Sequence, residues 1–223
     1  MAATDPARFE IVKNALHAAA EEMKIVLAKT AYSPLLKVAG DYSCGIFDTD
    51  GNMVAQGPDL PIHLGSMPDA VRAVVAAFPD AADGDVFIHN DPYNGGSHLP
   101  DVNVIAPAFH EGRLLGYGCV RAHWPDIGSA SPGSYGAVTE IYGEGLRLPP
   151  MRLTENGVLR EDLLEMLALN VRHPRDFRGD LAAQIGSVKL GEQRLRAAIA
   201  EFGGATLSAA INAMLDAAER HAR

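Results

Sequence analysis

The segment Val102–Ala122 reads VNVIAPAFHEGRLLGYGCVRA, and it decides which type of fold the chain can form. Two apolar runs, Val102–Phe109 and Leu114–Ala122, flank the short polar segment His110–Arg113. Apolar runs of this length around a glycine-containing turn are typical of a β-hairpin. The sequence therefore predicts two antiparallel strands here.

The same pattern occurs toward the amino terminus. Ser43–Phe47 and Met53–Gln56 read as strands around Asp48–Asn52, in which the Asp50-Gly51 pair is typical of a tight turn. A shorter apolar run, Asp85–His89, predicts a further strand before the turn-rich loop Asn90–Ser97.

Helices are expected on either side of these strands. Apolar residues recur at helical spacing from Asp5-Pro6, which suits an N-cap followed by proline at the first helical position, to about Thr30. The remaining predicted helices are Ser66–Phe78, Glu161–Asn170, Asp176–Phe202 and Ala205–Ala222. We therefore predict a mixed α/β fold in one domain, residues 1–223, with antiparallel β-hairpins in the first two-thirds flanked by an N-terminal helix and C-terminal helices.

Composition excludes several classes of partner. The chain has 28 acidic and 19 Lys and Arg residues, a formal net charge of −9, and no cluster of basic residues, so we expect no nucleic-acid partner. No apolar run is long enough to span a bilayer and the first residues lack an apolar signal region, so we expect a cytoplasmic protein without a membrane partner. Cys44 and Cys119 lie in apolar strands and are expected to be buried free thiols.

Four acids and imidazoles stand at the ends of predicted strands or in a turn. His98-Leu-Pro-Asp101 places an imidazole and a carboxylate three residues apart around a proline, while Asp41 precedes one strand and His123 follows another. Two carboxylates and two imidazoles suit a divalent Zn, Mn or Fe ion. Spacing alone leaves a second interpretation open, in which the imidazoles are loop hydrogen bonders and Asp41 is a turn or cap residue.

Seven motifs in order resemble those of the hydantoinase B/oxoprolinase family, which includes parts of caprolactamase and of acetone and acetophenone carboxylases. They are Asp41–Asp48 (DYSCGIFD), Gly84–Tyr93 (GDVFIHNDPY), His98–Asp101 (HLPD), Arg121–Gly128 (RAHWPDIG), Glu144–Pro150 (EGLRLPP), Asn170–Pro174 (NVRHP) and Gly179–Gln184 (GDLAAQ). The resemblance covers nearly the whole chain. It implies that Asp41, His98, Asp101 and His123 bind a divalent metal.

The chain also departs from the family pattern. Trp124 stands where the family commonly has a second histidine, and Ser129 follows Gly128 where the family often has a second glycine. Neither departure removes an expected ligand. Family members usually continue for hundreds of residues beyond the end of this chain, so we expect a truncated or naturally split subunit.

Three further residues are candidates for catalysis. His63 could carry protons or contact substrate, or it could bond at a helix start. Asp126 could hold a metal-bound imidazole through its second nitrogen, or be a solvated loop acid. Glu144, which flanks Ile141–Gly143 together with Glu140 at the end of the Gly-, Ser- and Pro-rich segment 125–142, is a candidate general base for water.

The resemblance implies a metal-containing subunit of an ATP-dependent cyclic amide hydrolase of the hydantoinase, oxoprolinase or lactamase type. ATP would bind an actin-like ATPase partner of hydantoinase A type in a hetero-oligomer, since no Gly-x-x-x-x-Gly-Lys pattern occurs in this chain. Two alternatives remain, namely a subunit of an ATP-dependent ketone carboxylase and a non-catalytic assembly subunit. The substrate is accordingly a small amide or ketone.

Overall fold

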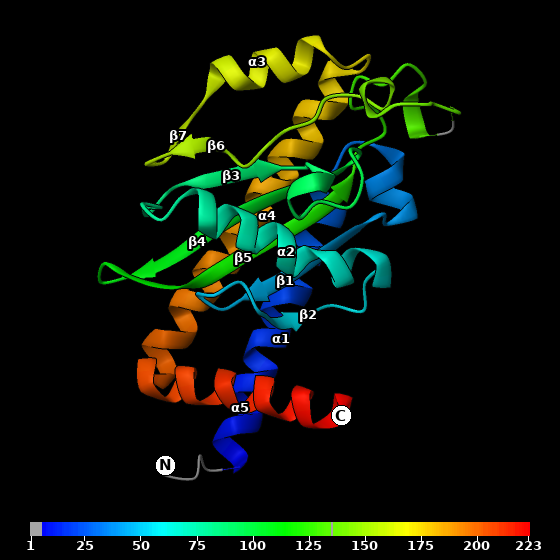
Figure 1. Cartoon of the computed structure of the whole chain (residues 1–223). Coiled ribbons are helices and arrows are strands. Elements are labelled where there is room, and N and C mark those ends of the chain that lie inside the picture. The colour runs from blue at the N-terminus through cyan, green and yellow to red at the C-terminus, as the bar shows by residue number, and fades with distance from the viewer. Residues whose placement is uncertain (1–5, 135) are drawn as a thin grey trace.

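The computed structural model of the chain describes residues 6–134 and 136–223, and its strands form one seven-stranded antiparallel sheet (Figure 1). The strands are β1 (Tyr42–Phe47), β2 (Met53–Gln56), β3 (Val86–His89), β4 (Asp101–His110), β5 (Arg113–His123), β6 (Met151–Glu155) and β7 (Val158–Leu159). Their order across the sheet is β2-β1-β5-β4-β3-β6-β7. The predicted mixed α/β fold is confirmed.

Five α-helices accompany the sheet in the described residues. They are α1 (Pro6–Thr30), α2 (Pro61–Ala77), α3 (Glu161–Leu169), α4 (Pro174–Phe202) and α5 (Gly204–Ala222). A π-helical turn, η1 (Leu35–Ala39), and three short 3-10 turns, η2 (Pro92–Asn94), η3 (Pro132–Ser134) and η4 (Ile141–Gly143), lie in the loops. The predicted N-cap residue Asp5 lies outside the described residues.

The predicted β4–β5 hairpin forms the centre of the sheet. Its register runs from Asp101 opposite His123 to His110 opposite Arg113. The two turn residues, Glu111 and Gly112, both have positive φ, as a tight two-residue hairpin turn requires. The hairpin therefore places Asp101 and His123 side by side at the opposite end from the turn.

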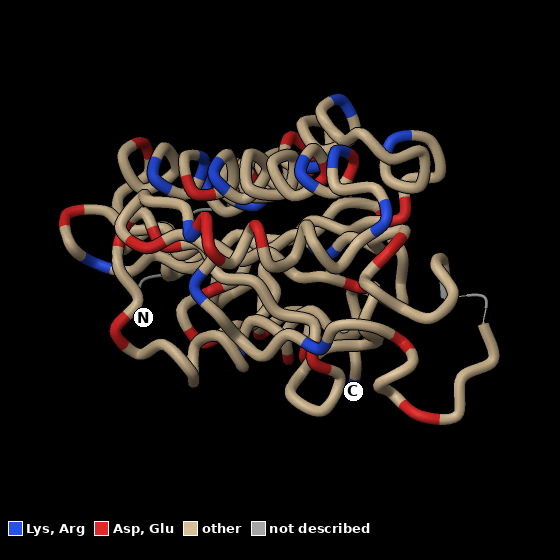
Figure 2. The backbone as a smooth tube through the Cα atoms, turned by 90° about the horizontal axis from the view of Figure 1, so that it is seen from above, with Lys and Arg blue, Asp and Glu red and all other residues tan. Residues whose placement is uncertain are grey.

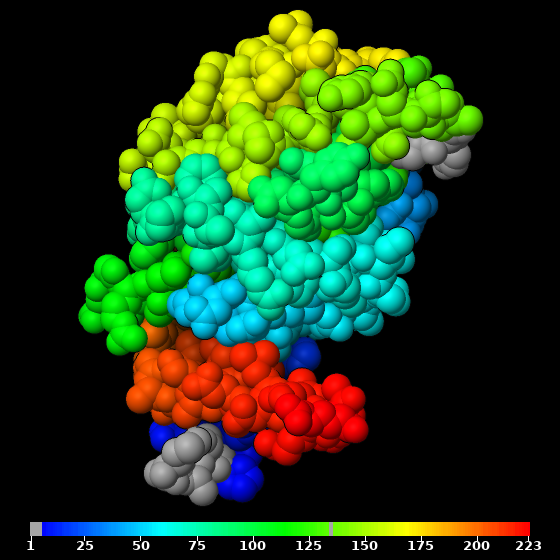
Figure 3. Space-filling view, in the orientation of Figure 1, coloured from blue at the N-terminus to red at the C-terminus, as the bar shows by residue number. Residues whose placement is uncertain are grey.

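Two different helix layers cover the two faces of the sheet. In Figure 1, α2 crosses the front face while α4 runs behind the sheet, where it also packs along α1. The core between the sheet and α1 and α4 is apolar and contains most of the buried hydrophobic residues. The smaller core under α2 contains Phe47, Phe87, Ile105, Tyr117 and Cys119 of the sheet. Figure 3 shows that α2 and the loop after β3 cover the front face as a continuous layer.

Two elements differ from the sequence-based expectation. The β6–β7 hairpin was not predicted, although Asn156 and Gly157 both have positive φ and form a two-residue turn there. Helix α2 begins at Pro61 rather than at Ser66, because Pro61 serves as a first-turn proline and Pro68 is accommodated inside the helix. As a result, His63 lies inside the first turn of α2.

Charged residues of both signs are interspersed over the chain when the molecule is viewed from above (Figure 2). Within the described residues, no single helix has the length and apolar composition of a membrane span. Helices α4 and α5 meet that test only when joined, and they bend by 113° at their junction.

Candidate metal centre

Three adjacent strands each place one candidate ligand at the same end of the sheet. Asp101 is the first residue of β4 and pairs with His123, the last residue of β5. Asp41 directly precedes β1, and its carbonyl accepts the backbone N–H of His123 at 3.0 Å. Residues directly opposite each other in an antiparallel pair project to the same face. The three side chains therefore lie on one face of the sheet, at the same end of its strands.

The turn before β4 places His98 at this end of the sheet. The N–H of Asp101 donates to the carbonyl of His98 at 3.0 Å, and the carbonyl of Pro100 accepts from Trp124 at 2.8 Å. Glycine is required just upstream, because a Cβ on Gly95, whose φ is +91°, would lie 2.4 Å from the carbonyl of Asp69 on α2. The predicted turn at His98–Asp101 is confirmed.

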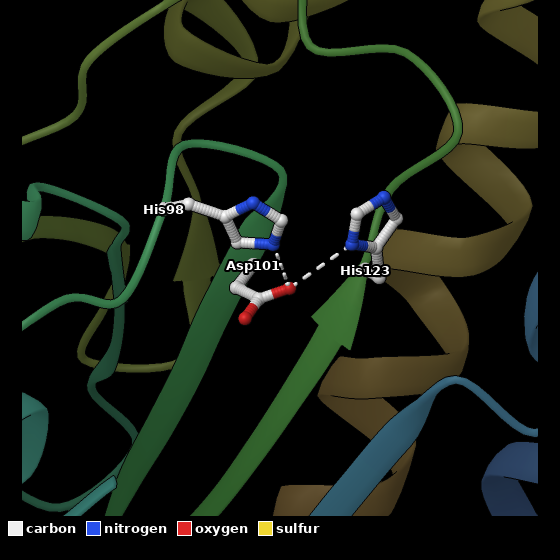
Figure 4. A group of neighbouring side chains, drawn as sticks. All are labelled: His98, Asp101 and His123. Atoms are coloured by element: carbon white, nitrogen blue, oxygen red, sulfur yellow. Dashed lines mark hydrogen bonds and ion pairs between the residues drawn. The ribbon is translucent and has the colours of Figure 1, made fainter. Parts of the chain in front are cut away.

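Asp101 lies at the centre of the cluster (Figure 4). Its Oδ1 accepts from His98 Nε2 at 2.7 Å and lies 3.1 Å from His123 Nδ1. Its Oδ2 accepts from Ser97 Oγ at 2.6 Å. The two imidazole rings lie 4.9 Å apart between centroids and are tilted by 47°. One carboxylate thus orients two imidazoles from different segments.

The charge of Asp101 is fixed by these contacts. Burial of its carboxyl group would by itself raise its pKa. Hydrogen bonds from the three neighbouring imidazoles and from Ser97 outweigh burial and hold the pKa of Asp101 well below its ordinary value. Asp101 is therefore ionised at neutral pH, as a metal ligand must be.

His63 approaches the cluster from α2. Its side chain is 3% exposed, its Nδ1 lies 3.2 Å from Ser43 Oγ, and its Nε2 lies 3.4 Å from Asp101 Oδ2. The same Nε2 lies 3.6 Å from Oδ1 of Asp41, whose side chain is 31% exposed. His63 therefore stands between the two carboxylates of the site.

An open pocket of about 500 Å³ contains all of these groups. It is lined by Asp41, Leu60, Ile62, His63, Ser97, His98, Asp101 and His123. A larger groove of about 800 Å³ between α1 and α4 has no acid or imidazole among its lining residues. The chemistry therefore points to the smaller pocket.

The donor set fits a divalent metal ion. Among the described residues, His98, Asp101 and His123 each offer one ligand atom, and these atoms all lie within 4.8 Å of one another. Mixed imidazole and carboxylate donors suit Zn, Mn or Fe. Asp41 lines the same pocket beside His63 but stands outside this closest group.

Asp126 has partners other than the predicted imidazole. Its carboxylate accepts the backbone N–H of Arg172 at 2.7 Å, Nη1 of Arg172 at 3.0 Å and the N–H of Gly128 at 2.9 Å. It lines a separate cavity of about 260 Å³ together with Trp124 and Phe177. Asp126 was expected to hold a ligand imidazole. Its carboxylate instead binds Gly128 and Arg172, which lies in the α3–α4 connection.

Trp124 also points away from the candidate ligands. Its indole N–H donates to Gln184 at 2.8 Å, and its ring packs against Phe177 with centroids 5.0 Å apart. This departure from the family pattern therefore fills the space under α4 and does not line the 500 Å³ pocket.

Glu144 lies next to the site and not within it. It follows η4 and lines a cavity of about 190 Å³ that it shares with His98, Pro100 and Val138. His98 therefore forms a wall between this cavity and the pocket that contains Asp101.

Three polar residues of the site were absent from the sequence-based candidates. They are Ser97, which bonds Asp101, Ser43, which contacts His63, and Arg121, which lies beneath both. Two of them could have been found from the sequence, because residues two apart on a strand share a face. Ser43 stands two residues from Asp41, and Arg121 two residues from His123.

Comparisons with known proteins show which proteins this chain is similar to. A family model described as hydantoinase B/oxoprolinase matches residues 5–223. The beta chain of caprolactamase from Pseudomonas jessenii is 40% identical over 225 residues, which cover 100% of this chain and 39% of that protein. The B-type chain of a putative D-/L-hydantoinase from Pseudomonas sp. strain NS671 is 32% identical and is matched over 98% of this chain and 38% of its own length.

Two solved structures are also similar. The crystal structure of ATP-dependent caprolactamase from Pseudomonas jessenii superposes with a TM-score of 0.92 at 39% identity, covering 98% of this chain and 38% of that one. A nucleotide-free acetone carboxylase structure gives a TM-score of 0.83 at 26% identity over 89% of this chain and 27% of that one. The chain spans about two-fifths of the length of these two curated relatives.

Proposed function

The chain belongs to the hydantoinase B/oxoprolinase family, and from that premise we propose that it is the metal-containing part of an ATP-dependent enzyme that hydrolyses small cyclic amides. The observation that carries the proposal is the convergence of Asp101, His98 and His123 in one pocket, with His63 opposite. The proposal treats residues 1–223 as one domain, supported by the single sheet and by the packing of α1 along α4.

Asp41, His98, Asp101 and His123 would hold the ion. A divalent ion bound there supplies a Lewis acid for a substrate oxygen. Oδ1 of Asp101 lies beside Nε2 of His98 and Nδ1 of His123, so these three atoms would face one ion and would exchange their mutual hydrogen bonds for bonds to it. The site then presents mixed donors toward an open pocket large enough for a small ring compound.

His63 is suited to carry a proton at the pocket wall. Its Nδ1 is held by Ser43 while its Nε2 faces both carboxylates in the pocket, so Nε2 is the ring nitrogen placed to exchange a proton there. Glu144 is a second candidate base, placed in the cavity on the other side of His98. Asp126 would have no direct part in this chemistry, because its carboxylate binds Arg172 and Gly128.

The partner in this proposal is an actin-like ATPase subunit that binds ATP in a hetero-oligomer. It would transfer the terminal phosphoryl group of ATP to the amide oxygen and release ADP, because an unactivated amide is a poor electrophile. Water would then add to the activated carbon, and the C–N bond would break to give the amine and an acyl phosphate, from which a second water releases inorganic phosphate. Support comes from the description of one relative as ATP-dependent and from the names of two relatives, each of which is one subunit of a larger enzyme.

A second candidate is ATP-dependent carboxylation of a small ketone. It is favoured by the similarity to acetone carboxylase, at a TM-score of 0.83. The same ligands and His63 would serve this reaction. Dependence on bicarbonate separates the two, since hydrolysis needs only water as the second substrate.

The test begins with the chain purified together with its partner subunit. We expect one bound Zn, Mn or Fe ion per chain and ATP-dependent opening of a cyclic amide without bicarbonate. His123→Ala should lower metal affinity by at least on the order of 10- to 100-fold, while His110→Ala at the far end of the same hairpin should leave it unchanged.

Three outcomes separate the alternatives. Product that forms only with bicarbonate supports the carboxylase. A protein without bound metal that assembles with its partner, and for which His123→Ala changes nothing, is a non-catalytic assembly subunit. Turnover that survives complete metal removal contradicts the metal-dependent mechanism altogether.

A further inference from the structure

A second row of polar residues lies directly beneath the candidate metal centre. Cross-strand pairing joins Ser43 to Arg121, Arg121 to Asn103, and Asn103 to His89. All four are 0% exposed. Because residues two apart on a strand share a face, this buried polar row projects toward α2 just inward of the site residues.

Arg121 connects the buried polar row to the start of α2. Its Nε donates to Asn103 Oδ1 at 2.8 Å, its Nη1 donates to the carbonyl of His63 at 3.2 Å and to Ser66 Oγ, and its Nη2 donates to the carbonyl of Ser66 at 3.4 Å. Asn103 is held in turn, since its Nδ2 donates to the carbonyl of His89 at 3.0 Å. One guanidinium thus fixes the first turns of α2 to the sheet.

The cost of this arrangement indicates that it serves more than packing. Within residues 6–134 and 136–223, Arg121 forms no direct ion pair with a carboxylate; its guanidinium donates to neutral oxygens, while Asp101 and Asp69 attract its charge only from a longer distance. A fully buried charge without an ionic partner is expensive compared with an apolar side chain of similar volume. The apolar core continues one row further in, at Ile105 and Cys119, where no charge is present.

Both ends of His63 are held by the buried polar row. Arg121 binds its backbone carbonyl, while Ser43 contacts its ring at Nδ1. The remaining ring atom, Nε2, then lies 3.4 Å from Asp101 and 3.6 Å from Asp41.

We propose that Arg121 is a positioning residue that holds the imidazole of His63 over the two carboxylates of the site. The proposal rests on the proposed function only in assuming that His63 acts at this pocket. Lysine cannot substitute, because a single ammonium cannot reach Asn103 and both α2 residues in the fork geometry of a guanidinium. Among the residues that Arg121 binds, only His63 faces the carboxylates of the site, so the effect of Arg121 on catalysis should pass through His63.

A double-mutant cycle on the complete complex tests this coupling. Arg121→Lys should lower kcat by on the order of 10- to 100-fold, because small misplacements of a catalytic group cost this much. In a His63→Asn background the same change should have little further effect, since the group that Arg121 positions is gone. Equal losses in both backgrounds would overturn the proposal, as would an unchanged kcat in Arg121→Lys.

Arg152→Lys is the matched control. Arg152 lies on β6, away from the pocket, and pairs with Asp80 at 2.9 Å and Asp85 at 3.3 Å. This variant should retain wild-type kcat even where it lowers thermal stability. A loss of kcat in Arg152→Lys equal to that in Arg121→Lys would show a general structural effect.

Histidine-selective ¹⁵N NMR of the chain gives a readout that needs no activity. The His63 ring signals, assigned by their loss in His63→Asn, should shift in Arg121→Lys while those of His98 and His123 stay in place. Unmoved His63 signals, or equal shifts in all three rings, contradict the proposal. If the complex hydrolyses no cyclic amide, the proposed function fails, whereas the NMR result still decides the role of Arg121.

Discussion

The two ends of the β4–β5 hairpin have similar compositions and different structures. One end carries Asp101 and His123, and the turn end carries His110 and Glu111 beside the β1–β2 turn around Asp48. The turn end even borders a pocket of about 410 Å³. Acids and imidazoles near a cavity are therefore common to both ends.

The difference lies in where the hydrogen-bond donors come from. Asp48 accepts from Asp50 and Asn52 of its own turn, whereas Asp101 accepts from side chains of the preceding turn and of β5. Asp101 is 2% exposed. Convergence of separate segments on a buried carboxylate, rather than composition, distinguishes the candidate site.

Asp101→Asn should have the largest effect of any substitution at either end of the hairpin. The amide keeps the size of the carboxylate but loses its charge and one acceptor, so we expect activity to fall by on the order of 10³-fold, or about 4 kcal/mol. Metal affinity, measured by calorimetric titration, should fall as well. Asp48→Asn at the turn end is the control and should keep both properties.

The burial of the site end should also appear as acid sensitivity. Burial lowers the pKa of His89 from 6.5 to about 4, with Asp91 opposing and Arg121 adding to the shift. Between these values the unfolded chain binds a proton that the folded chain does not, so acidification should lower the free energy of unfolding by up to about 3 kcal/mol.

Urea unfolding across this pH range measures the effect. His89→Phe should flatten the dependence on pH, because the titrating group is removed. Ile88→Val on the same strand is the control, since it should lower stability by roughly 1 kcal/mol at every pH and leave the slope intact. An equally steep slope in His89→Phe would assign the acid sensitivity to another group.

Metal removal should destabilise the chain through the site end of the hairpin alone. An ion present at about 100 times its Kd stabilises the folded chain by about 2.7 kcal/mol, which corresponds to a Tm change of roughly 5–11 °C for a chain of this size. Scanning calorimetry with and without chelator measures it. Asp101→Asn should lose this change in Tm, and Asp48→Asn should retain it.

The smallest effect is expected at the turn end. Asp48→Ala removes the acceptor for two backbone N–H groups and for Nδ2 of Asn52 at 2.8 Å, so stability should fall by about 1–2 kcal/mol without loss of metal. Asp50→Ala, at an exposed position in the same turn, is the control and should change stability less. Weakened metal binding in Asp48→Ala would show that the two ends are coupled.

Local patterns predicted much of the fold. The β4–β5 hairpin and the end of α1 at Thr30 followed from apolar periodicity and turn residues. The β6–β7 hairpin was missed although Asn156-Gly157 is a strong turn signal, because its strands are short and β7 has two residues. Helix α2 was expected to begin late, because Gly65 and Pro68 are unusual inside a helix.

The candidate site divides in the same way. Spacing and position at strand ends singled out Asp41, His98, Asp101 and His123, and the resemblance then implied that all four bind one metal. The contact of Asp126 with Arg172 joins residues 46 positions apart, through a connection whose place in space no local pattern specifies. The tie of Arg121 to His63 spans 58 positions and could likewise be recognised only once α2 lay on the sheet.

The pairing of β1 with β5 has a consequence for how the chain folds. Asp41 and His123 become neighbours only after the long intervening segment has closed, and such distant pairings form late because loop-closure entropy opposes them. An ion that needs both residues can bind only to the finished topology. It should therefore slow unfolding more than it accelerates folding, and so report that assembly is complete.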